Sequence, residues 1–170
     1  HGIAWAGKAT VFPCPLAQAA SFDVAMVRRV GTATAVEGRA KHHDHVRKYG
    51  NSTDGYATSY FAPNINIVRD IRWGRSMETY GEDTHLTARM AVAVITGLQR
   101  GNGSSNSPYL LGLAMAKHFA AYSVESNYAA GGTDGQYRLS ADFNVSDVDL
   151  HQTYFPAFEA ALTEGTVCVC

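Results

Sequence analysis

The sequence has no excess of charge of either sign and no long hydrophobic run. Fourteen Lys and Arg residues are balanced by fifteen Asp and Glu residues, so the formal net charge of the 170 residues is −1. Nucleic acids and anionic membranes attract proteins mainly through a basic excess, which is missing here. Apolar runs such as 110–116 are far shorter than the ~20 residues of a transmembrane helix. We therefore expect neither nucleic acid nor a membrane among the partners.

Cysteine is scarce, and the three cysteines suit neither a disulfide framework nor a metal site. Cys14 lies between two prolines. Cys168 and Cys170 alternate along a strand-like run and would point the same way, a geometry that disfavours a disulfide. The histidine-rich segment 41–45 suggests a metal, but a solvated helix end explains it better, because cations are favoured at helix C-termini. We expect no metal site.

Two phosphate-binding motifs are missing as well. The first strand–helix turn lacks the dinucleotide fingerprint Gly-x-Gly-x-x-Gly, and no Gly-x-x-x-x-Gly-Lys-Ser/Thr loop occurs. What is present is the composition of a folded domain, 46% hydrophobic and 17% charged, which excludes a disordered chain. The chain opens at His1 and stops inside an apolar, strand-like run. Because domains rarely end in this way, we expect a piece of a longer protein.

Strand-like and helix-like segments alternate along the chain. The strand-like segments are 9–12, 60–68, 111–119 and 166–170, and the helix-like segments run from Asp23 to His42 or beyond, from Thr84 to Gln99, and from Ser146 to Gly165. This order predicts an α/β fold with a parallel sheet and crossover helices. Because a (β/α)8 barrel takes ~250 residues, three and a half units correspond to about half a barrel. A doubly wound sheet is the alternative.

Polar and ionisable residues gather where the predicted strands end. Arg75 and Glu78 follow the second strand, and Lys117 and His118 close the third. In parallel α/β folds, the loops after strand C-termini build the active site. Two basic residues side by side at a strand end are costly unless polar groups face them. Sugar hydroxyls, which donate and accept hydrogen bonds, are suitable partners.

Three ordered motifs resemble the N-terminal barrel domain of glycoside hydrolase family 3. They are residues 61–75 (FAPNINIVRDIRWGR), 78–83 (ETYGED) and 117–122 (KHFAAY), with weaker matches at 1–2, 9–15, 138–150 and 154–158. The likeness spans nearly the whole chain. It implies that residues 1–170 are part of a (β/α)8 (TIM) barrel, a partial α/β barrel whose remainder lies, with a C-terminal domain, beyond this chain.

The resemblance also implies a retaining, exo-acting glycosidase that needs no cofactor and acts on an oligosaccharide. In such an enzyme, an Asp nucleophile attacks the anomeric carbon while a second carboxylic acid protonates the leaving oxygen. Both catalytic groups are expected beyond Cys170, so no residue of this chain is assigned a catalytic role and the chain alone should be inactive. By position in the motifs, the substrate-binding residues are Arg75, Lys117, His118 and Arg138.

The β-xylosidase branch of the family matches best. Tyr128 stands where the β-glucosidase branch has an Arg, and Ala120 and Ala121 replace the Pro-Gly of the bacterial N-acetylglucosaminidases. Ile71 departs from the usual Pro, and Phe61 from a frequent Tyr. We expect a β-xylosidase, with or without α-L-arabinofuranosidase activity, acting on xylan-derived oligosaccharides. A β-glucosidase of the same family and a non-catalytic carbohydrate-binding relative are the alternatives.

Several of these residues also have plain structural interpretations. Arg75 and Glu78 could be only an i, i+3 salt bridge, and Arg138 an ordinary loop arginine. Trp73 could be a core residue instead of a sugar platform. A further set suits structural ion pairs better than ligands: Arg69, Arg72 and Asp83.

Three Asn-x-Ser/Thr sequons are weak evidence for secretion. They begin at Asn51, Asn102 and Asn144, and two lie in stretches rich in Gly, Ser and Asn that could tolerate glycans. We expect an extracellular glycoprotein.

Overall fold

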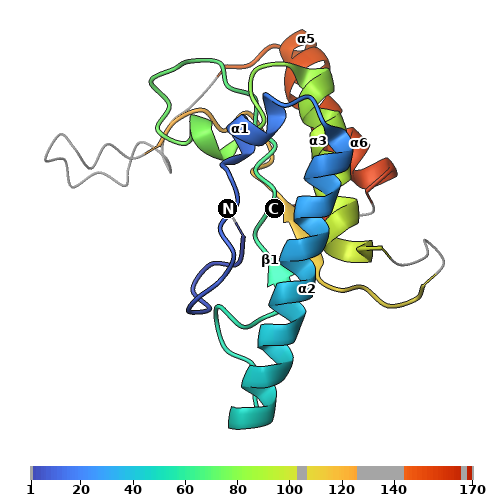
Figure 1. Cartoon of the computed structure of the whole chain (residues 1–170). Helices are drawn as coiled ribbons and strands as arrows, with labels where there is room; N and C mark the ends of the chain where they lie inside the picture. Colours follow the sequence, from blue (N-terminus) through green and yellow to red (C-terminus); the bar gives the residue numbers. More distant parts are fainter. Residues whose placement is uncertain (1, 103–106, 126–143, 166–167, 170) are drawn as a thin grey trace, which may run out of the picture.

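The computed structural model describes residues 2–102, 107–125, 144–165 and 168–169. In chain order, the elements are α1 (Pro15–Ala19), α2 (Val24–Tyr49), β1 (Ser59–Tyr60), the 3-10 helix η1 (Ser76–Glu78), α3 (Thr84–Arg100), β2 (Leu113–Ala116), α5 (Asp147–Asp149), the π-helix η3 (Leu150–Tyr154), α6 (Pro156–Thr163) and β3 (Cys168–Val169). Figure 1 shows the long helix α2 beside α3, and α3 also packs against α6. Among the described residues, no helix has the length and apolarity that crossing a membrane requires.

The three strands form one parallel sheet in the order β1-β2-β3. Ser59 pairs with Leu113 in the β1–β2 ladder, and Met115 pairs with Cys168 in the β2–β3 ladder. The chain between β1 and β2 contains α3, and the chain between β2 and β3 contains α6. Parallel strands need such helical crossovers, because a tight turn cannot join them. The predicted parallel α/β architecture is confirmed at this level.

Both long helices begin at the side chains that their sequence indicates. Asp23 precedes α2 and accepts a hydrogen bond from the Met26 amide at 2.7 Å, while Asp83 precedes α3 and accepts one from the Leu86 amide at 2.6 Å. Each carboxylate satisfies an amide that the first helical turn leaves unpaired. The predicted limits of α3 agree with the structure within one residue, and α2 does extend beyond His42, to Tyr49.

A close contact between two glycines brings α2 and α3 together. A Cβ on Gly97 would lie 2.3 Å from the Arg28 carbonyl oxygen, and one on Gly31 would lie 2.7 Å from that of Val94. Neither position can therefore carry a side chain without moving a backbone. Around this contact lies the apolar core, which includes Val27, Ala35, Met90, Ile95, Leu98, Ala114, Ala116 and Phe158.

The strands are shorter than the apolar runs suggest, and the first predicted strand is wrong. Residues 9–12 form no strand; the Thr10 amide donates to both carboxylate oxygens of Glu37 on α2, at 3.1 and 3.0 Å, instead of joining a ladder. Regular pairing of β1 stops before Pro63, which has no amide hydrogen to donate. The next residues still run beside β2, since Ile65 donates to the Lys117 carbonyl at 2.9 Å.

The third predicted helix, 146–165, is interrupted. Ser146 caps its start as expected, accepting from the Asp149 amide at 3.1 Å. Pro156 cannot donate a hydrogen bond to the turn before it, and the Phe155 amide reaches five residues back, to the Leu150 carbonyl, at 2.8 Å. The segment is therefore α5, η3 and α6 in succession, with Phe158 and Ala161 of α6 buried against α3.

Candidate functional site

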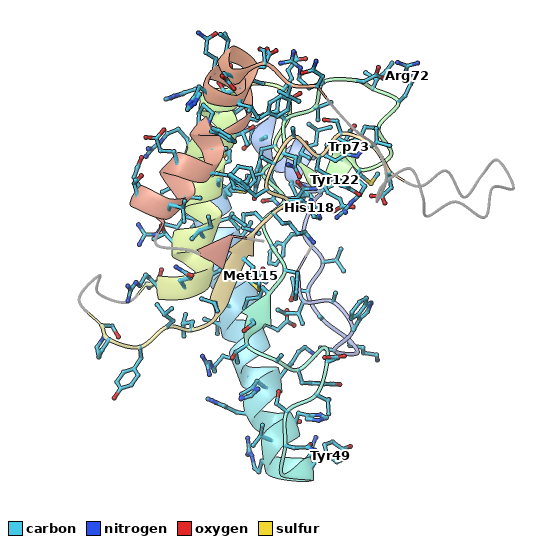
Figure 2. The ribbon with its side chains drawn as sticks, turned by 180° about the vertical axis from the view of Figure 1, so that it is seen from behind. Tyr49, Arg72, Trp73, Met115, His118 and Tyr122 are labelled. Carbon is cyan, nitrogen blue, oxygen red and sulfur yellow. The ribbon has the colours of Figure 1, made fainter. Side chains whose placement is uncertain are left out.

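The candidate site lies just beyond the C-terminal ends of β1 and β2. An isolated parallel bridge joins Asn64 to Lys117 at this point, so the residues that follow each strand come side by side. Figure 2 shows Trp73, Tyr122 and His118 close together there, with Arg72 farther out. Their rings are in contact: the centroids of Trp73 and Tyr122 are 5.7 Å apart, and those of His118 and Tyr122 are 4.5 Å apart.

Arg75 is bound from several sides. Its Nε and Nη2 donate to the two carboxylate oxygens of Glu78 at 2.8 and 2.6 Å, and its Nη1 lies 3.6 Å from a carboxylate oxygen of Glu125. The guanidinium also lies over the Tyr122 ring, 5.6 Å from its centroid. The Arg75 side chain is 17% exposed. The predicted Arg75–Glu78 salt bridge is therefore present, but it is one contact among several.

The charges of this cluster stabilise one another. The hydrogen bonds that Arg75 donates to Glu78 raise the pKa of Arg75 above its usual value, against the opposing effect of burial. Hydrogen bonding by Arg75 in turn lowers the pKa of the Glu78 carboxyl, and the nearby charge of Lys117 acts in the same direction. Both groups are charged at neutral pH, and Lys117 belongs to the same electrostatic cluster as Arg75.

His118 joins the two strand ends. Its Nε2 lies 3.2 Å from Nη1 of Arg75, and its Nδ1 lies 3.0 Å from Oδ1 of Asn66. The Asn66 amide also pairs with the backbone of His118, accepting from its N–H at 2.9 Å and donating to its carbonyl at 2.8 Å. The structure thus brings together Arg75 and His118, two predicted site residues that are 43 positions apart.

Asn66 lies inside the motif of residues 61–75, and the sequence assigns it no role of its own. It is 2% exposed and makes three hydrogen bonds to one residue, His118. The signal in the sequence is the alternation of Asn64 and Asn66 inside an otherwise apolar run. An amide at such a position must find a hydrogen-bonding partner, but the sequence does not identify it.

The structure decides some of the alternative interpretations. Trp73 is 5% exposed and belongs to the core, so it is not an open sugar platform. Arg72 pairs with Asp70 at 2.5 Å, as expected for a structural ion pair, and this contact lowers the pKa of Asp70. Asp83 caps α3, and Arg69 lies 5.9 Å from the centroid of the Tyr154 ring. Arg138 lies outside the described residues, so its position relative to Lys117 stays a prediction.

The histidine-rich stretch of α2 contacts Tyr56 in the loop that follows this helix. His42 Nδ1 lies 2.7 Å from the carbonyl oxygen of Tyr56, and the His45 ring stacks on the Tyr56 ring at 4.2 Å between centroids. Within the ranges that the structure describes, no group of three or more His, Cys, Asp or Glu side chains is arranged to hold a metal ion.

Comparison with known proteins finds one family. The model of the glycosyl hydrolase family 3 N-terminal domain matches residues 1–169. A probable exo-1,4-beta-xylosidase of Aspergillus terreus is 38% identical over 160 residues, which are 94% of this chain and 18% of that protein. A xylan 1,4-beta-xylosidase of Xylanibacter ruminicola is 36% identical over 170 residues, covering 98% of this chain and again 18% of the relative. The chain therefore spans about a fifth of the curated relatives' length.

Solved structures of two kinds of glycosidase resemble the fold. A β-glucosidase from Erythrobacter marinus matches with a TM-score of 0.74 and 34% identity, over 99% of this chain and 19% of that one. An exo-β-xylosidase in complex with a xylobiose aziridine probe matches with a TM-score of 0.75 and 29% identity, over 94% of this chain and 20% of that one. These likenesses alone do not separate the two activities.

Proposed function

Because the chain belongs to the glycosyl hydrolase family 3 N-terminal domain family, we propose that it is part of a retaining, exo-acting β-xylosidase. The substrate would be an oligosaccharide derived from xylan, with α-L-arabinofuranosidase activity as an additional capacity. Support comes from the curated relatives, which include xylosidases from a fungus and a bacterium. Residues 1–170 would form about half of a (β/α)8 barrel, which the remainder of the barrel and a C-terminal domain complete.

The observation that carries the proposal is the meeting of Arg75 and His118 beyond the ends of two parallel strands. A sugar hydroxyl placed beside them would accept from the Arg75 guanidinium, which His118 contacts on another edge. Lys117 adds an ammonium donor, whose charge also lowers the pKa of Glu78. Arg138 is proposed to complete this set of substrate-binding residues from the following loop.

In the proposed enzyme, this chain binds the sugar and supplies no group that cleaves the glycosidic bond. Retaining glycosidases need two carboxyl groups beside the scissile bond, one as nucleophile and one as acid/base. Glu78 is already bound to Arg75, and Glu125 accepts a hydrogen bond from Tyr122. As the family resemblance implies, we propose that both catalytic carboxyl groups lie beyond Cys170, and the 170 residues alone are expected to hydrolyse no glycoside.

A β-glucosidase of the same family is the second candidate. The β-glucosidase from Erythrobacter marinus matches 99% of this chain at 34% identity. A carbohydrate-binding relative without catalytic carboxyl groups is the third candidate, and the sequence after Cys170 tests it.

A substrate comparison in the full-length protein that carries this segment tests the proposal. We expect a higher kcat/KM on a 4-nitrophenyl β-xyloside than on the corresponding β-glucoside. Arg75→Ala should lower kcat/KM on the preferred substrate, whereas Arg72→Ala, at an arginine whose side chain is 88% exposed, should leave it unchanged. Preference for the glucoside would favour the second candidate. A folded protein without any hydrolysis would favour the third.

We also propose that the protein is extracellular and glycosylated. The sequon residues Asn51, Asn102 and Asn144 are all exposed, as N-glycosylation requires. Expression in a secreting eukaryotic host should give a protein whose mass falls after treatment with an endoglycosidase. A mass that does not change would contradict glycosylation at these sites.

A further inference from the structure

We propose that Asn66 is a positioning residue: by holding the His118 imidazole in one tautomer, it keeps Nε2 as a hydrogen-bond acceptor for the Arg75 guanidinium. The inference rests on the proposed function, in which Arg75 and His118 hold a sugar. Asn66 itself is 2% exposed, so it would act through His118 without touching the substrate.

The orientation of the Asn66 amide follows from its backbone contacts. The His118 N–H can only donate, and it lies 2.9 Å from Oδ1 of Asn66. The His118 carbonyl can only accept, and it lies 2.8 Å from Nδ2. Reversing the amide would place a donor against a donor and an acceptor against an acceptor. The oxygen of Asn66 therefore faces the ring of His118.

The tautomer of His118 follows from the amide orientation. Because Oδ1 of Asn66 accepts, the ring Nδ1 at 3.0 Å must carry the hydrogen. On the other side of the ring, Nη1 of Arg75 can only donate, so Nε2 at 3.2 Å must accept. The same neutral tautomer satisfies both contacts. The hydrogen bond made by one ring nitrogen thus sets the role of the other.

The tautomer of His118 in turn affects how the guanidinium of Arg75 is held. Glu78 holds Nε and Nη2 on one edge, and His118 contacts Nη1 on another. A guanidinium bound at two edges is held in one plane, which places its remaining N–H groups before a substrate arrives. If His118 turned to the other tautomer, its Nε2–H would point at a group that also donates, and this second support would be lost.

Asn66 is itself fixed in place. Its backbone N–H donates to Oδ1 of Asn64 at 3.1 Å, within the segment that runs beside β2. A buried amide in this position cannot be replaced by an apolar side chain without leaving the His118 backbone groups unpaired. An aspartate would keep the acceptor for Nδ1 but would lose the donor to the His118 carbonyl.

A double-mutant cycle in the full-length protein tests the inference. Asn66→Ala should lower kcat/KM on the β-xyloside by about tenfold, the effect of one lost hydrogen bond. In a His118→Ala background, the same substitution should change kcat/KM by less than about twofold, because the imidazole that Asn66 orients is gone and only the backbone contacts remain. Thr87→Val, at a fully buried hydroxyl of α3, is the control for changing a buried polar group and should leave kcat/KM unchanged.

Failure of the proposed sugar site and failure of the positioning role of Asn66 give different kinetic results. If His118→Ala leaves kcat/KM unchanged, the proposed sugar site is wrong. If His118→Ala lowers kcat/KM but Asn66→Ala does not, or if the effects of Asn66→Ala and His118→Ala simply add, the positioning role of Asn66 is overturned.

A spectroscopic measurement reads the tautomer directly. In protein labelled with ¹⁵N-histidine, the signals lost in His118→Gln identify the His118 ring. The wild type should show a protonated Nδ1 and an unprotonated Nε2 for this ring. Asn66→Asp should keep the Nδ1–H signal, because an acceptor remains, whereas Asn66→Ala should lose it. An Nε2–H tautomer in the wild type would overturn the inference even if Asn66→Ala proved unable to fold.

Discussion

Arg75 and Glu78 form a two-pronged ion pair across the 3-10 helix η1, with N–O distances of 2.8 and 2.6 Å. Paired N–H···O bonds of this kind fix the plane of the guanidinium as well as its charge. The pair leaves Nη1 of Arg75 directed at His118 and Glu125. A salt bridge and a binding site are thus compatible interpretations of Arg75, because the carboxylate that neutralises it also orients it.

Glu78→Gln should make the thermal stability of the protein less dependent on pH. The pKa of Glu78 is lowered in the folded state, chiefly by its hydrogen bond from Arg75. A carboxyl group whose folded pKa is depressed contributes stability above its unfolded pKa, and this contribution is lost as pH falls through the folded pKa. The wild type should therefore melt at a higher temperature than Glu78→Gln near neutral pH, and the difference should shrink below the usual Glu value of 4.5.

The control for this experiment is Arg75→Ala. Without its main partner, replacing Glu78 by Gln should change the melting temperature less, and with less dependence on pH. Melting curves between pH 3 and pH 7 of the wild type, Glu78→Gln, Arg75→Ala and the double variant give the comparison. An equal difference between the wild type and Glu78→Gln at every pH would contradict the assignment.

Gly97→Ala should destabilise the protein, although alanine normally favours a helix over glycine by about 0.5–1 kcal/mol. The new Cβ would lie 2.3 Å from the Arg28 carbonyl oxygen on α2 and would push the two helices apart. Overpacking of this kind costs about 1–3 kcal/mol. Gly74→Ala is the matched control, since nothing lies within 4 Å of its Cβ position. Thermal melting that ranked Gly97→Ala at or above the wild type would show that α2 and α3 can separate at little cost.

The helices could be predicted more closely than the strands, and the reason is local. Asp83 caps α3 through an amide three residues away, so the signal and its effect lie in one turn of chain. Residues 9–12 look equally strand-like, but a ladder needs a partner from elsewhere, and Glu37 of α2 occupies the Thr10 amide instead. The sequence shows Pro156, which cannot donate a hydrogen bond to the helical turn before it. It does not show that the Phe155 amide donates to the Leu150 carbonyl instead, and this contact decides where the third helix is interrupted.

The site could be predicted in part. Arg75 and His118 were expected from the motifs, and the structure brings them together. The role of Asn66 could not be predicted, because its three hydrogen bonds go to a residue 52 positions away. Only the pairing of the segments after β1 and β2 decides that contact, and the pattern of apolar and polar residues does not fix which polar groups meet.

Lys117→Ala in the full-length protein should lower kcat/KM strongly. A hydrogen bond from a charged donor is worth about 1.5–3 kcal/mol, which corresponds to a loss of roughly 10- to 150-fold. Lys117→Met keeps most of the aliphatic stem, so a similar loss in that variant would come from the ammonium group and not from packing. Lys48→Ala is the matched control, because Lys48 is an exposed lysine that pairs with Asp44 at 2.7 Å in the last turns of α2. Steady-state kinetics on the β-xyloside decide the matter: if both Lys117 variants match the wild type, Lys117 does not bind the sugar.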